Sequence, residues 1–295
     1  MKAFFKQIPV IFYFTLACVV SWLSLLPIIG IDGFLGKTIP SDNQMPLLFI
    51  AMCAGPLISC MLSIYLIDGK DGFKELTTKL VKWKINFRFY LIALFTAPAL
   101  TMVAYLILSL FSPEFTPAIF SSEGKLMIII GGIVGALVAG FFEELGWTGF
   151  AIPKLRLKYN IINTGLIVGI VWGIWHFPLF MIKDPTGVIP LIILLMVRLI
   201  THLPAFRILM TWVYDRTGSL LIIMLMHMSL TGSALIFQPN IESGVDIIIS
   251  NLTYTILLYA AVFIINNFTK GQITGRISKD EIHKIHTKTM NYEND

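Results

Sequence analysis

Long apolar runs alternate along this chain with short segments that carry most of its charge. A helix needs about 20 apolar residues to cross a bilayer, and by that measure the pattern predicts about eight transmembrane helices. The expected fold class is therefore all-α, a polytopic membrane helix bundle. The predicted spans are residues 8–31, 46–67, 87–111, 125–146, 161–182, 187–206, 218–237 and 246–267.

The composition supports the same class. Of the 295 residues, 56% are hydrophobic and only 13% are charged, and the mean hydropathy is +0.81, which is typical of a membrane protein. No soluble domain fits between the spans, so we expect one integral-membrane domain over 1–295, with a polar tail at 269–295. The net charge of +5 is spread over short segments between apolar runs. We therefore expect the lipid bilayer as a partner and no nucleic acid.

The distribution of Lys and Arg predicts the orientation. Cytoplasmic segments of membrane proteins are enriched in these residues. If the N-terminus is inside, the inner segments hold most of the 22 Lys and Arg residues, including Arg207 and Arg216 after the sixth span. The outer segments hold only Lys37, Lys125 and Lys183. We predict a multi-pass protein of the cell membrane with both termini in the cytoplasm.

Two adjacent carboxylates, Glu143 and Glu144, end an apolar run that extends over residues 126–142. An ionised carboxylate in the hydrocarbon region is costly and usually faces the bundle interior or a water-filled cavity. A pair of like charges is harder still to bury. The pair is therefore wetted at the interface, held by structural hydrogen bonds, or used in chemistry.

Small residues recur at steps of four in the fourth and fifth spans, a pattern that lets helices approach closely in lipid. In the fourth span they form two faces, and in the fifth span one: Gly131, Gly135 and Ala139; Gly132, Ala136 and Gly140; and Gly165, Gly169 and Gly173. We predict that these two spans pack against each other, beside the Glu pair.

Two histidines stand in apolar surroundings on other spans. His176 ends the fifth span, and His227 lies in the seventh, with Thr231 on the same helical face four residues later. A single histidine of this kind is usually a structural hydrogen-bonder, whereas two histidines with a Glu pair suggest general acid–base chemistry and oxyanion stabilisation. Arg198 and His202 form a further i, i+4 pair, which either supports the site or lines a polar groove.

A metal-free site is the preferred interpretation. No His-Glu-x-x-His sequence is present, so the zinc-protease helix is excluded. In the metal-free site, Glu143 and His176 activate a water, and His227 and Thr231 face the developing oxyanion. The alternative is a zinc ion held by His176, His227 and one Glu.

The expected depths of Glu143 and His176 in the membrane do not agree with a shared site. If the hairpin between the fourth and fifth spans covers residues 151–160, Glu143 is level with about Leu166 to Val168. His176 then lies ~12 Å farther along the helix axis at ~1.5 Å per residue. Tilt, a helix break at Gly146 or Gly149, or an earlier start of the fifth span are the alternatives.

Three ordered motifs resemble a known family. The first is Glu143-Glu144 followed by Gly-Trp and a Gly-Phe-x-x-Pro tail, the second runs from Trp172 to Pro178, and the third runs from Met210 to His227. Together they cover about residues 125–238. They resemble the CAAX protease and bacteriocin-processing family (CPBP, also called Abi) of intramembrane proteases, which includes the type II CAAX prenyl endopeptidases.

The resemblance implies roles for several residues. Glu143 is the general base that holds a water with His176, Glu144 is the second member of the Glu pair, and His227 stabilises the oxyanion. Two positions depart from the family's motifs: Thr148 stands where an arginine is usual, and Thr231 stands where an asparagine is usual. Arg156 or Arg198 would then have to supply the missing cation to Glu144.

The predicted function is that of an intramembrane endopeptidase acting on a membrane-associated peptide or protein. The alternatives are a non-catalytic protein of the same fold, such as a bacteriocin-immunity factor or scaffold, and a proton-coupled transporter. Against the transporter, the two halves show no internal repeat and no matched pair of broken helices. The sequence does not identify the substrate or the oligomeric state.

Overall fold

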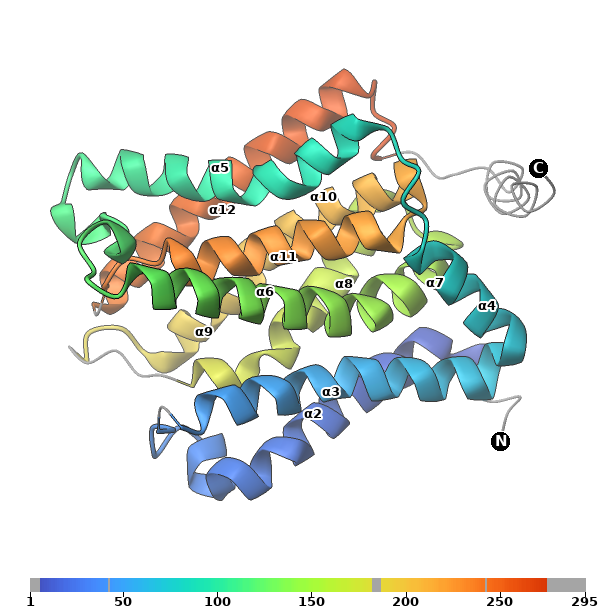
Figure 1. Cartoon of the computed structure of the whole chain (residues 1–295), viewed down its shortest axis with the longest axis horizontal. Helices are drawn as coiled ribbons and strands as arrows, with labels where there is room; N and C mark the ends of the chain where they lie inside the picture. The colour runs from blue at the N-terminus through green and yellow to red at the C-terminus, as the bar shows by residue number, and fades with distance from the viewer. Residues whose placement is uncertain (1–5, 42, 182–186, 242, 275–295) are drawn as a thin grey trace.

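The computed structural model describes residues 6–41, 43–181, 187–241 and 243–274. These residues form an elongated helical bundle whose helices run back and forth along its long axis (Figure 1). The described elements are α2 (Pro9–Phe34), α3 (Met45–Ser63), η1 (Ile64–Asp68), α4 (Gly69–Leu80), α5 (Phe87–Ser109), η2 (Pro113–Phe115), η3 (Ala118–Phe120), α6 (Lys125–Gly146), η4 (Trp147–Ala151), α7 (Ile152–Arg156), α8 (Ile161–Trp175), η5 (Phe177–Phe180), α9 (Leu191–Ile200), α10 (His202–Thr217), α11 (Leu220–Ile236) and α12 (Gly244–Phe268).

The helices are apolar enough for a membrane protein, which confirms the predicted fold class. Six helical runs in the described chain are long enough to cross a bilayer: Pro9–Phe34, Met45–Leu80, Phe87–Ser109, Lys125–Arg156, Leu191–Thr217 and Gly244–Phe268. Helices α8 and α11 are also apolar but have only 15 and 17 residues. The number of crossings stays a prediction.

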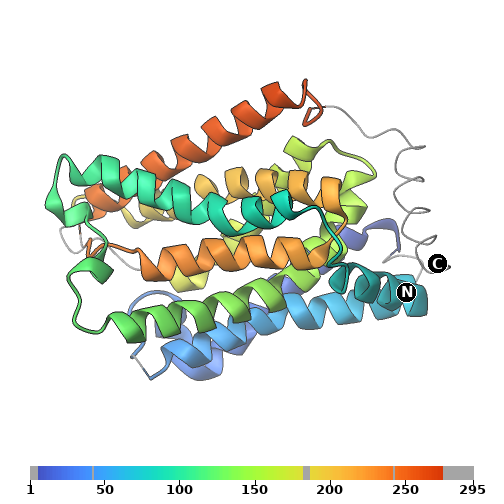
Figure 2. The same cartoon turned by 45° about the horizontal axis from the view of Figure 1, so that its top comes forward.

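Helices α2 and α12 place the two ends of the described chain at the same end of the bundle. Helix α2 begins there and α12 finishes there, in both views (Figures 1 and 2). This arrangement fits an even number of crossings.

The predicted hairpin between the fourth and fifth spans starts too early. Helix α6 continues through the π-helical η4 and through α7 to Arg156, and α8 begins at Ile161. At Gly146, the last residue of α6, the helix passes close to Tyr13, and a Cβ at this position would lie 2.0 Å from the Tyr13 hydroxyl. The glycine therefore allows this close approach. Counted back from Arg156 and forward from Ile161, Glu143 is level with about residue 174. The mismatch in depth therefore disappears.

The glycine faces do not pack against each other, so the predicted pairing of the fourth and fifth spans is wrong. In α6, a Cβ on Gly132 would lie 2.4 Å from Ile236, and a Cβ on Gly140 would lie 2.5 Å from Met228. Both of these neighbours are in α11. Glycines of α8 contact the next span instead. A Cβ on the last of them, Gly173, would lie only 1.8 Å from the carbonyl oxygen of Leu199 in α9. Spacing predicted close approach, but it did not specify the partner.

The sixth span is displaced from its predicted position at 187–206. The helical run extends over Leu191–Thr217, with a kink at Thr201 between α9 and α10. Pro204 lies in the first turn of α10, where a proline needs no backbone N–H partner. Arg207, which we expected in a cytoplasmic segment, is therefore inside the bundle and fully buried.

Candidate active site

The Glu pair lies at the end of α6, where α8, α10 and α11 supply the facing side chains. Glu143 is 3% exposed and Glu144 is 0% exposed, so the interpretation of both as wetted residues at the interface is wrong. Although they are neighbours in sequence, the two carboxylates have different partners.

Glu144 is surrounded by donors. The Arg207 guanidinium donates to both of its oxygens, at 2.9 and 2.8 Å. His227 donates from Nδ1 to Oε1 at 2.6 Å, and the Thr148 hydroxyl donates to Oε2. A buried carboxylate with a cation and two further donors remains ionised without solvent. Glu144 is therefore the fixed centre of a polar cluster.

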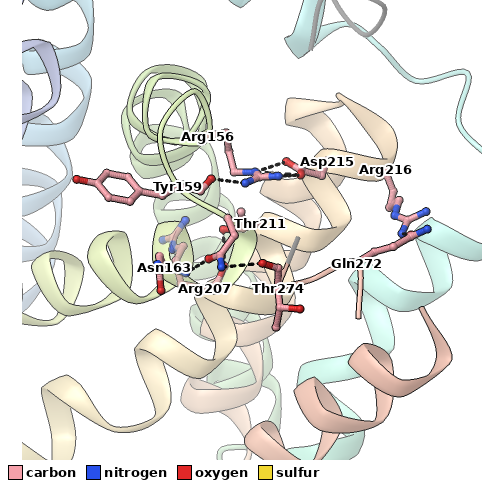
Figure 3. A network of polar contacts seen from close by, with 10 residues as sticks. Arg156, Tyr159, Asn163, Arg207, Thr211, Asp215, Arg216, Gln272 and Thr274 are labelled. Atoms are coloured by element: carbon pink, nitrogen blue, oxygen red, sulfur yellow. Dashed lines mark hydrogen bonds and ion pairs between the residues drawn. The ribbon is translucent and has the colours of Figure 1, made fainter. Parts of the chain in front are cut away.

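Arg207 is the residue that sequence reasoning missed. Of the two cations expected for Glu144, Arg156 pairs instead with Asp215, at 2.6 Å (Figure 3). Arg198 also makes no ion pair with Glu144 in the described structure. The signal was present in the sequence: Arg207 follows Phe206 and precedes an apolar run, which is unusual for a loop between two spans.

Glu143 is held more loosely. Its Oε2 accepts a hydrogen bond from the Trp172 indole N–H at 2.7 Å. The same oxygen lies 3.9 Å from Nε2 of His227, which is too long for a direct hydrogen bond. Within the described residues, no Lys or Arg forms a salt bridge with Glu143. It is therefore the less compensated of the two carboxylates.

Trp172 connects the parts of the site. Its ring centroid lies 5.1 Å from that of His227 and 5.4 Å from that of His176. The Arg207 guanidinium stacks over the same indole at 4.2 Å, a favourable cation–π geometry. One aromatic side chain therefore contacts both imidazoles and the buried arginine while it donates to Glu143.

His176 lies at the end of α8, half-buried. Its Nδ1–H donates to the carbonyl oxygen of Trp172 at 2.8 Å, so in the neutral ring Nε2 is the nitrogen that can accept a proton. The Trp175 ring packs on it at 4.6 Å. Helix α2 supports this end of α8, because the Trp22 indole donates to the carbonyl oxygen of Trp175 at 3.0 Å.

Thr231 and the Arg198–His202 pair lie outside the Glu144 cluster. Thr231 is half-buried on α11, one turn after His227, and no hydrogen bond joins it to the two glutamates in the described part of the chain. His202 packs against Tyr254 of α12, with ring centroids 5.8 Å apart. The structure therefore brings together Glu143, Glu144 and His227, places His176 beside them through Trp172, and leaves Thr231 at the edge.

The cluster contains donors and acceptors suited to hydrolysis. His227 lies between the carboxylates, with Nδ1 bound to Glu144 and Nε2 facing Glu143. In a site without bulk water, electrostatic interactions are strong and pre-oriented donors are effective. No group of three or more His, Cys, Asp or Glu side chains among the described residues is arranged to hold a metal ion.

Fold and site together define a class: a multi-pass helical membrane protein with a buried cluster of Glu, His and Arg. The family described as "Type II CAAX prenyl endopeptidase Rce1-like" matches residues 125–232. The chain is 34% identical over 74 residues to "CAAX prenyl protease 2" of Methanococcus maripaludis. That match covers 25% of this chain and 22% of the relative. Residues 125–232 therefore form an Rce1-like segment, which confirms the resemblance and contains every residue of the cluster.

Proposed function

We propose that this protein is an intramembrane endopeptidase of the CAAX-processing type, which hydrolyses a peptide bond of a membrane-associated peptide or protein. One observation carries the proposal. Adjacent buried glutamates have opposite surroundings, since Glu144 is saturated by Arg207, His227 and Thr148 while Glu143 accepts one hydrogen bond from Trp172. A purely structural pair would need both carboxylates to be compensated.

In the proposed reaction, Glu143 and Nε2 of His176 hold the attacking water. Glu143 takes a proton as the water oxygen bonds to the carbonyl carbon, and the carbonyl oxygen becomes the oxyanion. In this proposal His227 carries a proton on both ring nitrogens, so that Nδ1–H stays bound to Glu144 while Nε2–H donates to the oxyanion, with the Thr231 hydroxyl as a second donor. Glu143 then passes this proton to the leaving nitrogen as the C–N bond breaks, which leaves a carboxylic acid and an amine. No covalent intermediate and no metal ion are needed.

The test is cleavage of a library of peptides by purified wild-type protein in lipid. Glu143→Gln is the control, and His227→Ala and Thr231→Asn are the companions. We expect His227→Ala to lower the rate about 10²–10³-fold, and Thr231→Asn to hold or raise it. Elemental analysis of the active preparation tests whether it contains a bound metal ion. Stoichiometric zinc that is lost together with activity on chelation contradicts the metal-free mechanism.

The rival function is a non-catalytic membrane protein, such as an immunity factor or scaffold. It predicts no cleavage by wild type and an unchanged cellular phenotype in Glu143→Gln at matched membrane abundance. That pair of results would overturn the proposed activity.

We also propose that both termini are cytoplasmic, in the cell membrane. The distribution of Lys and Arg and the shared end of α2 and α12 support this orientation (Figures 1 and 2). Reporters fused after Lys288 and within residues 112–123 should be active on the inner and outer sides, respectively. A C-terminal reporter active only outside the cell contradicts it.

A further inference from the structure

Helices α5 and α12 enclose a cavity that no residue of the active-site cluster lines. Its volume is about 350 Å³, which lies within the range of sites that bind small molecules. Figure 2 shows α12 diverging from α5 toward the end of the bundle where α5 begins and α12 finishes. Helices α10 and α11 complete the lining of this α5–α12 cleft, which includes Ile92, Thr96, Trp212, Met226, Ala261 and Ile264.

Apolar side chains form nearly all of the α5–α12 cleft. Of its lining residues, only Thr96 and Trp212 carry an N–H or O–H group, and the Thr96 hydroxyl already donates to the carbonyl oxygen of Ile92 at 2.6 Å. Ile264 lines the cleft and is 51% exposed, so the cleft opens onto the outer surface of α12. Apolar cavities stay dry, and packed interiors leave few voids larger than a water molecule. Hydrocarbon from the bilayer is therefore the filling that matches this cavity.

Arg88 stands one helical turn beyond the lining of the cleft. It lies four residues before Ile92 and therefore on the same face of α5, at the end of the bundle where this helix begins. Its side chain is exposed and forms no salt bridge within the described residues. Residues 82–113 and 247–274 contain no Asp or Glu. Neither wall of the cleft therefore supplies a carboxylate to this arginine, and basic groups at such a place attract anionic lipid headgroups.

Trp212 adds a hydrogen-bond donor close to Arg88. Its indole Nε1 is buried without a partner among the residues that the structure describes, although a buried indole N–H usually has one. The Trp212 ring lies 6.3 Å from the ring of Phe89, the residue next to Arg88. The unpaired donor is therefore near the charged end of the cleft. In a phospholipid, the ester carbonyl groups are the acceptors between the charged headgroup and the hydrocarbon chains.

We propose that the α5–α12 cleft binds an anionic phospholipid from the leaflet at this end of the bundle. One acyl chain lies between α5 and α12, an ester carbonyl accepts the hydrogen bond from Trp212, and Arg88 holds the phosphate. A guanidinium matches a phosphate because it donates two parallel hydrogen bonds to it. This binding site is separate from the proposed proteolytic activity and does not depend on it.

The bound lipid supports the helices that hold Glu144. Leu209 lines the cleft, two residues and therefore about 200° around α10 from Arg207. Met226, which also lines it, directly precedes His227 in α11. The acyl chain thus packs on α10 and α11 from the side opposite Arg207, and it stabilises the folded protein because it binds only the assembled helices.

The experiment is native mass spectrometry of the purified, delipidated full chain in detergent. The probes are dioleoyl phosphatidylglycerol, which is anionic, and dioleoyl phosphatidylcholine, which has the same chains and no net charge. We expect wild type to bind one phosphatidylglycerol about fivefold more tightly than phosphatidylcholine, the factor that one arginine near anionic lipid supplies. Arg88→Met should remove this preference.

Lys70→Met is the matched control. Lys70 is an exposed cation of α4, which lies on the opposite side of the bundle from α12 at the same end (Figure 1). This variant removes the same charge and should keep the preference for phosphatidylglycerol. If wild type binds the two lipids equally, or if Arg88→Met and Lys70→Met lose the preference alike, the inference is wrong and the proposed function stands.

Two further variants locate the acyl chain and the ester. Ala261→Phe fills the cleft with a ring, so we expect binding of both lipids to fall about tenfold or more. Trp212→Phe keeps the ring and removes the N–H, and it should weaken binding about twofold to tenfold. Phosphatidylglycerol should raise the unfolding temperature of wild type but not that of Ala261→Phe, whose unfolding temperature without lipid shows that it folds.

A farnesylated peptide tests another occupant of the cleft. If Ala261→Phe blocks binding of this peptide while phosphatidylglycerol binds it as tightly as wild type, the cleft holds a substrate tail and the inference is wrong. If the peptide leaves bound phosphatidylglycerol in place, the lipid site is supported. Neither result depends on whether the protein cleaves a peptide.

Discussion

The two sides of the Glu pair differ in how completely their charges are compensated. On the Glu144 side, one carboxylate meets a guanidinium, an imidazole and a hydroxyl. On the Glu143 side, one carboxylate meets an indole N–H and faces a histidine nitrogen at 3.9 Å. A fully paired charge keeps one protonation state, whereas an under-partnered one can take up and release a proton. In the proposed function, this difference gives Glu144 a stabilising role and Glu143 the chemical one.

The largest expected effect lies on the Glu143 side. Glu143→Gln keeps the shape and the hydrogen bond from Trp172, but an amide cannot accept the proton from water. We expect cleavage to fall about 10²–10⁴-fold with membrane abundance unchanged. The measurement is a cleavage rate at matched abundance, beside a thermal unfolding curve.

Glu144→Gln is the matched comparison, one residue along the same helix. It leaves Arg207 and His227 without a carboxylate, so we expect lower abundance and a lower unfolding temperature. Equal stability and equal loss of activity in the two variants would show that the glutamates do not have separate roles.

The next effect is on stability. Arg207→Met removes the only salt-bridge partner other than His227 that Glu144 has among the described residues. Breaking a buried ion pair typically costs about 3–5 kcal/mol, so we expect a marked loss of folded protein after solubilisation. Folded yield by size-exclusion chromatography, with Arg216→Met as the control, measures it. If Glu144→Gln in the same chain restores part of the yield, the two residues are coupled; additive losses would show that they are not.

The smallest effect is expected at Thr148. Thr148→Val keeps the shape and removes the hydroxyl that donates to Glu144. Side-chain hydrogen bonds between membrane helices are worth about 0.6 kcal/mol on average and at most about 1.7 kcal/mol. We therefore expect a small fall in unfolding temperature and nearly full activity. A loss as large as that of Arg207→Met would show that the Thr148 hydroxyl stabilises Glu144 as strongly as Arg207 does, contrary to this prediction.

Local pattern was sufficient to predict the helical class. Apolar runs show where helices can cross the bilayer, because every side chain that faces lipid must be apolar. Small residues show where two helices can approach closely, because a small side chain leaves room for the neighbouring backbone. It also singled out Glu143, Glu144, His176 and His227, since a polar residue in an apolar run is conspicuous. These predictions needed no knowledge of which helix lies beside which.

Which side chains pair with the two glutamates could be learned only from the tertiary structure. Arg207 reaches Glu144 across 63 positions, and Trp172 reaches Glu143 across 29. Hydrophobic periodicity does not contain these pairings, so Arg207 was expected in a loop and the glycines of α6 and α8 were paired with each other.

By itself, therefore, the sequence determined that this protein is a bundle of apolar helices with two glutamates and two histidines inside it. Only the packing of α6 against α11 and of α8 against α9 and α10 decided which glutamate is neutralised. The physical reason is that burying a charge is unfavourable wherever it stands in the chain, whereas its compensation depends on which donors the other helices bring within about 3 Å.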